Sequence, residues 1–312
     1  MALVKEKSED VKTGNRTSSL QLRTQRRGMA KLKTSLGILY ERKLAFIGAI
    51  LVILVLFTAV FTSFITPSDP VEMRMKRRLE LPSWKHPLGL DQFGRDVWSR
   101  IAYGTRVSLK VSVISVFIGL FLGVPVGALA GYAGGHTDNI LMRLMDALLA
   151  FPAILLAITI VAVLGSSIIN IMIAIGIVYA PIFSRITRGS VLSEKEKEYV
   201  EAARVSGESS FRILFCEILP NALSPIIVQG TILFAYAILV ESALSFIGLG
   251  VAPPTPSWGI MLSEAAEFME YYPLQTIFPG IAISLTVFGF NLLGDGLRDI
   301  LDPRLSQEKG QQ

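Results

Sequence analysis

The chain has 312 residues, of which 51% are hydrophobic and 18% are charged, and its mean hydropathy is +0.53. Soluble domains carry about a quarter charged residues, so this balance indicates a membrane protein. The net charge of +5 does not indicate a nucleic-acid partner, because the cations collect beside apolar segments, where they set membrane topology. One cysteine, Cys216, excludes an intrachain disulfide, and with only His86 and His136 beside it no Cys/His metal pattern exists.

The apolar part of the chain follows a polar and basic tail, residues 1–43. Six apolar segments come after it, most of them near the length of about 20 residues that a bilayer-spanning helix needs. They are 44–66, 111–133, 147–164, 168–183, 222–240 (extending to about 250) and 274–294. Backbone groups in lipid must be satisfied within the segment, so we expect helices. The sequence therefore predicts an all-α polytopic membrane protein with six transmembrane helices.

The distribution of Lys and Arg predicts the orientation of these spans. If the N-terminus lies inside, 21 of the 30 Lys and Arg residues fall in inner segments and nine in outer ones. This asymmetry favours both termini inside. All nine outer cations lie between Arg74 and Lys110, in a predicted extracellular segment, 67–106.

Part of this outer segment has the pattern of a short amphipathic helix at the outer membrane interface, capped by Asp91. Its apolar face consists of Phe93, Val97 and Ile101, and Trp98 and Tyr103 are the aromatic anchors. Ion pairs four residues apart are Asp91/Arg95 and Asp96/Arg100. In this interpretation the arginines lie on the surface and need not cross the membrane. The alternative is an ordinary soluble loop helix.

The most polar block of the second half is EYVEAARVSGESSFRILFCEILPNA, residues 198–222. Ser193 and Glu196 form the S-x-x-E pattern of a capping box, which predicts a helix start. Gly207 fits a left-handed helix end, and Ser209 can begin a second short helix that leads through Pro220 to the fifth span. We expect helix, glycine turn, helix on the cytoplasmic side.

The composition of this block suggests a contact surface. Ala202 and Ala203 are small enough to let another backbone approach, and Phe211, Leu214 and Phe215 supply apolar side chains. The alternative is that these residues pack only against the ends of the protein's own helices.

Here EAARVSG followed by ILP resembles the EAA loop of ABC-importer permeases, where the membrane subunit docks on its ATPase. Four further stretches resemble the peptide-importer branch of that family: HPLGLDQFGRDVWSR, GALAGYAGGHTDNILMRLMDALLAFP, LSFIGLGVAPPTPSWG and NLLGDGLRDILDPRL. Together the motifs cover nearly everything from His86 to Leu305, in the order expected of the second permease type in dipeptide, oligopeptide and nickel systems. One departure is Glu217, where the general loop pattern often has isoleucine.

The resemblance implies a type I ABC-importer permease fold with a core at 107–300, a coupling loop at 191–221 and a cytoplasmic tail at 301–312. It implies a cytoplasmic (inner) membrane in a bacterium or archaeon. The implied partners are a related permease forming a heterodimer, two ABC ATPase subunits and an extracellular solute-binding protein. It assigns ATPase coupling to Glu201, Ala202, Ala203, Gly207, Phe211, Leu219 and Pro220.

The chain itself is expected to be neither an enzyme nor a cofactor carrier. No G-x-x-x-x-G-K-[ST] phosphate loop occurs, so ATP and magnesium are expected on the partner ATPases. His86 and His136 fall in an outer loop and a cytoplasmic turn, which does not suit a Ser/His/Asp triad. The predicted solute is a di- or oligopeptide, with a nickel complex or a related small ligand left open.

Glu241 is the clearest ionisable residue near membrane depth. A carboxylate facing lipid is costly, so we expect it to face the pore, the partner permease or a wet cavity. There it would pair with a cation of the partner near the outer gate or attract a passing ammonium group; the alternative is solvation at the outer interface. Asn291 is a second candidate for the same path. With Asp146, Glu241 also keeps open a different function, a proton-coupled secondary transporter.

Overall fold

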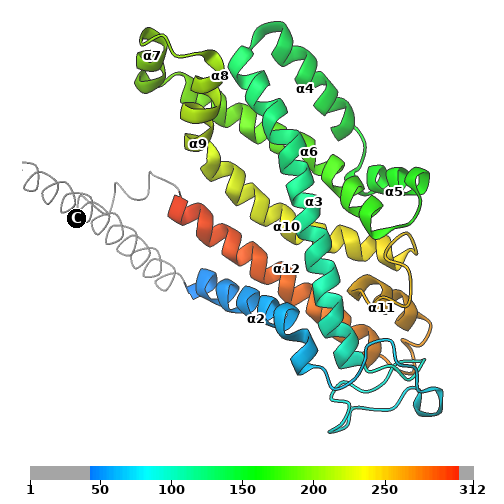
Figure 1. The fold of residues 1–312 in the computed structure, drawn as a ribbon. Helices are drawn as coiled ribbons and strands as arrows, with labels where there is room; N and C mark the ends of the chain where they lie inside the picture. Colours follow the sequence, from blue (N-terminus) through cyan, green and yellow to red (C-terminus); the bar gives the residue numbers. More distant parts are fainter. Residues whose placement is uncertain (1–42, 302–312) are drawn as a thin grey trace, which may run out of the picture.

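A computed structural model describes residues 43–301 of the protein (Figure 1). The predicted tails therefore lie outside the described residues, apart from Lys43 and Leu301, which belong to helices. The helices are α2 (Lys43–Ile65), η1 (Met75–Arg77), α3 (Val97–Ala133), α4 (Gly135–Leu149), α5 (Ala153–Leu164), α6 (Ile168–Lys195), α7 (Glu198–Val205), α8 (Ser210–Arg212), η2 (Ile213–Ile218), α9 (Leu219–Asn221), α10 (Leu223–Phe246), α11 (Trp258–Ala266) and α12 (Leu274–Leu301). Within 43–301 the only β pairing is an isolated bridge between Leu90 and Asp96, so the predicted all-α class is confirmed.

Five helices of the described part are long and apolar enough to cross a membrane: α2, α3, α6, α10 and α12. The predicted third span, 147–164, is not one helix. It breaks before Pro152, and α4 and α5 meet at an angle of 87°. A residue before proline avoids the helical conformation, and the 12 residues of α5 reach only about 18 Å, short of the hydrocarbon core. The count reaches six only if this bent pair forms one span.

The predicted interfacial helix is wrong as a separate element. Its C-terminal half is the start of α3, which runs without interruption from Val97 through Pro125 to Ala133. The cap is Asp96, whose side chain accepts from Ser99 N at 2.8 Å, whereas Asp91 lies in the preceding turn. At 37 residues, α3 is about 55 Å long, so it joins the outer segment to the membrane part as one rod.

The second correction concerns the cytoplasmic end of α6. This helix continues to Lys195, twelve residues past the predicted end of the fourth span, because nothing in that stretch stops a helix. Ser193 therefore lies inside α6, and the predicted capping box does not form. The next helix, α7, begins after Lys197 without a side-chain cap.

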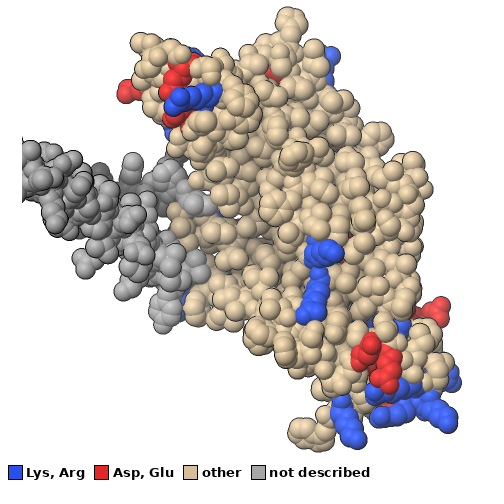
Figure 2. Space-filling model, viewed as in Figure 1, with Lys and Arg blue, Asp and Glu red and all other residues tan. Residues whose placement is uncertain are grey.

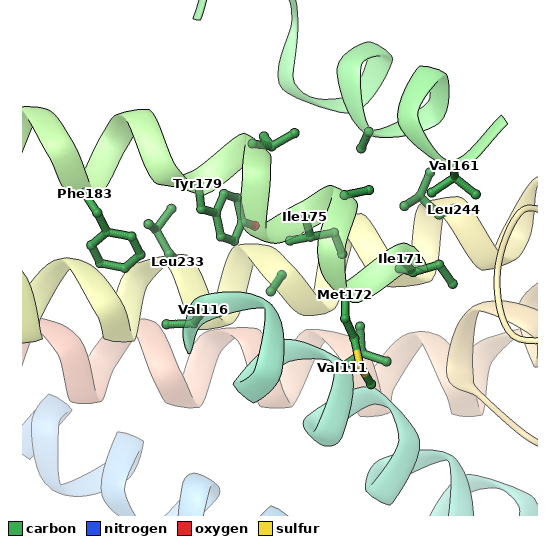
Figure 3. Close-up of a cluster of buried hydrophobic side chains, with 14 of the residues drawn as sticks. Val111, Val116, Val161, Ile171, Met172, Ile175, Tyr179, Phe183, Leu233 and Leu244 are labelled. Carbon is green, nitrogen blue, oxygen red and sulfur yellow. The ribbon is translucent and has the colours of Figure 1, made fainter. Parts of the chain in front are cut away.

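Close packing of α3 against α6 forms the centre of the molecule (Figure 3). Gly123 and Gly127 of α3 permit it, since a Cβ at either position would overlap a backbone carbonyl of α6, at Ala180 or Ser184. Small residues let helix backbones approach in this way where lipid supplies no hydrophobic drive. The buried side chains around this contact come from α3, α5, α6 and α10, and Figure 3 shows Val111, Ile171, Ile175, Phe183 and Leu244 among them.

Charged residues mark the two ends of the molecule. Figure 2 shows them over α7 and α8 at one end and over the outer segment at the other, with a largely uncharged surface between. The helix α2 lies along α12 at the side of the bundle and exposes apolar residues such as Leu54 and Phe64. This surface matches a lipid-facing helix.

Candidate functional site

The candidate site is the coupling segment, defined here as α7, α8, η2 and α9 (Glu198–Asn221), at the cytoplasmic end in the predicted orientation. The segment has the predicted order of helix, glycine turn, helix. Gly207 has φ +78° and closes α7: its N–H donates to Arg204 O at 3.0 Å, and Glu208 N–H donates to Ala203 O at 3.2 Å. These two bonds form a Schellman cap, which favours glycine at its left-handed position. No neighbouring atom lies within 4 Å of a Cβ built at Gly207, so backbone conformation alone requires glycine there.

The second half of the segment begins as predicted at Ser209, whose Oγ accepts from Arg212 N. After the short α8 the backbone takes a π-helical path through η2. It then continues into α9 and α10 with no loop, since Ala222 N–H donates to Ile218 O at 3.0 Å. The coupling segment is therefore joined to α10 by continuous helical hydrogen bonding.

One face of the coupling segment packs onto its own protein. Val200, Ile213, Leu214 and Ile218 are buried, together with Ala128 of α3 and Val191 of α6. The prediction that Leu214 offers itself to a partner is therefore wrong, because its side chain is 2% exposed.

The opposite face is exposed. Phe211 is 72% exposed and stacks on the half-buried Phe215 with 4.5 Å between ring centroids. Val205, which the sequence interpretation missed, is 86% exposed. Of the predicted coupling residues, Glu201, Ala202, Gly207, Phe211 and Pro220 are exposed, and Ala203 and Leu219 are half-buried.

Hydrogen bonds fix the start of α7 to the end of α6. Tyr199 Oη donates to Glu194 Oε2 at 2.9 Å, and Lys197 Nζ lies 2.6 Å from Glu194 Oε1. Partial burial, followed by the Glu194 carboxylate, raises the pKa of Tyr199 to about 12. The phenol thus remains a donor at neutral pH.

A polar groove of about 520 Å³ lies beside this region, between α4 and α6. Arg188 of α6 makes a bidentate pair with Asp138 of α4, with both N···O distances 2.6 Å, and Arg185 pairs with Asp146 at 2.6 Å. These pairs hold the bent arm α4 on α6. Asp146 is thereby placed in an exposed ion pair rather than in a buried relay.

Two of the nine outer cations lie buried, not on the surface as expected. Arg95 and Arg100 are each 1% exposed. Both donate to Glu264 Oε2 of α11, at 2.5 and 2.9 Å, and Arg95 Nε donates to Asp91 Oδ2 at 2.6 Å. We call Asp91, Arg95, Arg100 and Glu264 the outer ion cluster. Of the predicted pairs, Asp91/Arg95 forms, whereas the Asp96 carboxylate instead lies 2.8 Å from His86 Nδ1.

Glu241 is buried within this one chain: its side chain is 0% exposed, so it is not solvated at the outer interface in this structure. Its predicted part as a pore or gate residue remains a prediction. Its carboxylate accepts from Ser108 Oγ of α3 at 3.0 Å and from Ser245 Oγ at 2.8 Å. Asn291 is half-buried in α12, and its predicted part in the path remains a prediction.

The long apolar helices of the described residues define a polytopic membrane protein, and the coupling segment exposes apolar side chains at one end of it. The family described as "Binding-protein-dependent transport system inner membrane component" matches residues 123–307, and the chain belongs to this family.

Curated relatives cover most of the chain. It is 47% identical over 267 residues to the dipeptide transport system permease protein DppC of Alkalihalophilus pseudofirmus, covering 86% of this chain and 88% of the relative. It is 46% identical to DppC of Escherichia coli K12 (86% and 91% covered) and 45% identical to the glutathione transport system permease protein GsiD of Pectobacterium atrosepticum (85% and 88% covered).

Among solved structures, a chain of the MetNI methionine ABC transporter in an inward-facing conformation matches with a TM-score of 0.55 at 17% identity. The match covers 65% of this chain and 96% of that chain, and it supports the fold alone. The family assignment makes this chain a non-catalytic inner-membrane permease component of an ABC importer. It also excludes the alternative of a proton-coupled secondary transporter.

Proposed function

We propose that this chain forms half of the translocation pore of an ATP-driven peptide importer and passes the motion of an ATPase to that pore through the coupling segment. The observation that carries the coupling role is the two-faced packing of that segment. One face is buried against α3 and α6, while Val205 and Phe211 extend from the other. Phe211 also contacts the half-buried ring of Phe215. Exposed apolar side chains that form a contiguous patch mark an interaction site.

The arrangement suits a lever. The packed face and the Schellman cap at Gly207 make the segment rigid, and α9 leads into α10 without a loop. An ATPase that closed on ATP and held Glu201, Ala202, Ala203 and Phe211 would therefore displace α10 as well. Leu219 and Pro220 lie at the junction between the docked part and α10.

A peptide solute is supported by the relatives, whose names specify dipeptide and glutathione transport. The finer assembly that we propose has one related permease as heterodimer partner, two ATPase subunits that bind ATP and magnesium, and an extracellular solute-binding protein. This chain would hold no cofactor. In this assembly solute choice resides largely in the binding protein.

The test is reconstitution of the complete complex in liposomes with the binding protein outside and ATP inside. We expect accumulation of a radiolabelled dipeptide that stops when ATP is omitted or when the ATPase is inactivated. The matched variants are Phe211→Asp, which changes the exposed face, and Cys216→Ser, an exposed position in the same segment. Loss of ATPase copurification with Phe211→Asp but not Cys216→Ser supports the docking surface; full assembly with both variants overturns it.

A further inference from the structure

The buried carboxylate of Glu241 lies where α10 meets α3 and α11. No Lys, Arg or His within residues 43–301 forms an ion pair with it, and hydroxyl groups surround it instead. Ser108 belongs to α3 and Ser245 to α10, and the side chain of Ser257, the N-cap residue of α11, is also within hydrogen-bonding reach. One carboxylate thus joins three helices.

The first turn of α11 packs tightly around this point. A Cβ added at Gly259 would overlap Ser242 O and would lie 2.7 Å from both Ser242 Cα and Ser245 Cβ, so α11 lies directly on the backbone of α10. Trp258 is 1% exposed, and its Nε1 donates to Ile101 O of α3 at 3.1 Å. The beginning of α11 therefore follows α10 and α3 as one body.

The other end of α11 is tied to the outer segment. Glu264 lies in the last turn and accepts hydrogen bonds from Arg95 and Arg100. A buried ion pair resists breaking because removal of one partner leaves an uncompensated charge. Displacement of α11 is thereby passed to the segment that faces the outer solution.

These contacts form a continuous connection across the membrane part. It begins in the coupling segment and continues along α10, in which Leu223 and Glu241 lie about 27 Å apart along the helix axis. It ends through α11 at the outer ion cluster. We propose that α10 and α11 act as a rigid relay between the coupling segment and the outer segment, with Glu241 as the positioning residue that fixes α11 to α10. This inference rests on the proposed function for its driving force.

The experiment uses the complete complex with a fluorescent label on α11. The chain has one cysteine, so Cys216→Ser followed by Ala266→Cys places a label at an exposed position near the end of α11. The same complex without Ala266→Cys corrects for labelling of other subunits. The fluorescence of the label is compared between vanadate-trapped and nucleotide-free complexes. The variants are Glu241→Gln, which keeps the shape of the side chain, and Glu241→Leu, which removes every hydrogen-bond acceptor from it.

In the wild type we expect the label to respond to trapping. In both Glu241 variants we expect the response to be lost and peptide uptake to fall at least about fivefold, the lower range of typical coupling between sites, while ATP hydrolysis continues near the wild-type rate. Leu239→Met, on the exposed side of α10, should change none of these readouts.

Two outcomes overturn the relay. The first is unchanged uptake and label response in both Glu241→Gln and Glu241→Leu. The second is an equal loss of uptake and ATP hydrolysis with the label response retained, which denotes a merely structural role for Glu241. If Glu241→Leu fails to assemble, Glu241→Gln decides, since it preserves the side-chain volume. Absence of peptide uptake by the wild type would instead overturn the proposed function, and the label response to trapping would still test the relay.

Discussion

The coupling segment exposes apolar side chains, whereas the outer ion cluster buries charged ones. At the coupling segment, apolar side chains such as Val205 and Phe211 remain exposed on a polar helix pair. At the outer cluster, Arg95 and Arg100 are buried against Asp91 and Glu264. The first region leaves apolar side chains uncovered, as expected of a docking site, whereas the second pairs its buried charges within the chain.

The contrast shows how the two ends can serve one transport cycle. A surface that is covered only in the assembled complex can bind a separate motor, but it adds little to the stability of the chain alone. A buried cluster of paired charges fixes the geometry of the chain at the far end. Substitutions at the two regions should therefore separate into losses of assembly and losses of stability.

The largest expected effect is at the outer ion cluster. Arg95→Ala removes the closer of the two arginine partners of Asp91, leaving Arg100 at 3.6 Å, and also removes one donor from Glu264, so we expect a loss of about 3–5 kcal/mol in the free energy of unfolding. The measurement is denaturant unfolding of the purified chain in detergent. Lys85→Ala, an exposed cation in the same segment, is the control and should leave stability unchanged. An equal effect of both substitutions would contradict the structural role of the cluster.

Leu214 and Phe211 provide the next comparison because they lie three residues apart but differ in exposure, at 2% and 72%. Leu214→Ala empties a buried site and should cost about 2–5 kcal/mol of stability. Phe211→Ala removes an exposed ring, so we expect little change in stability but weaker retention of the ATPase during copurification. If Phe211→Ala destabilised the chain as much as Leu214→Ala, the two-faced description of the coupling segment would be wrong.

Gly207 tests the rigidity of the docking surface. A valine must hold the left-handed conformation at a cost of at least about 1–2 kcal/mol, because its Cβ crowds the following carbonyl. We expect Gly207→Val to weaken the cap of α7 and to reduce uptake per ATP hydrolysed. Asparagine tolerates this conformation better, so Gly207→Asn should retain more activity. Equal uptake by Gly207→Val and wild type would remove Gly207 from the lever.

Local signals in the sequence predicted the features that depend on neighbouring residues. The left-handed Gly207, the cap at Ser209 and the Asp91/Arg95 pair all formed between residues within four positions of one another. The equally local Ser193/Glu196 capping box and Asp96/Arg100 pair did not form, because α6 continues to Lys195 and the Asp96 carboxylate caps α3. The long apolar segments likewise predicted the helices that follow from lipid burial.

Features that depend on tertiary contacts were not predicted. The burial of Arg95 and Arg100 requires Glu264, more than 160 residues later in the chain. Glu241 was expected to face the pore, the partner permease or a wet cavity because a charge in an apolar run is costly, and only the fold brings Ser108 within reach of it. The 87° bend at Pro152 was missed because the prediction followed hydropathy across the proline.

The smallest expected effect concerns Tyr199, at the junction of α6 and α7, where the coupling segment is anchored. Its pKa is raised to about 12, chiefly by burial and then by Glu194, so the folded state favours the neutral phenol. A raised folded pKa contributes stability that is complete below the unfolded pKa of about 10 and is lost as pH rises through 12.

Tyr199→Phe removes the hydrogen bond to Glu194 and should cost about 0.5–1.5 kcal/mol at neutral pH. Above pH 10, stability should fall more steeply in wild type than in Tyr199→Phe, because the variant has no phenol to ionise. Chemical unfolding followed by circular dichroism between pH 7 and 11 checks both statements, and parallel pH profiles for the two proteins would show that Tyr199 does not anchor α7.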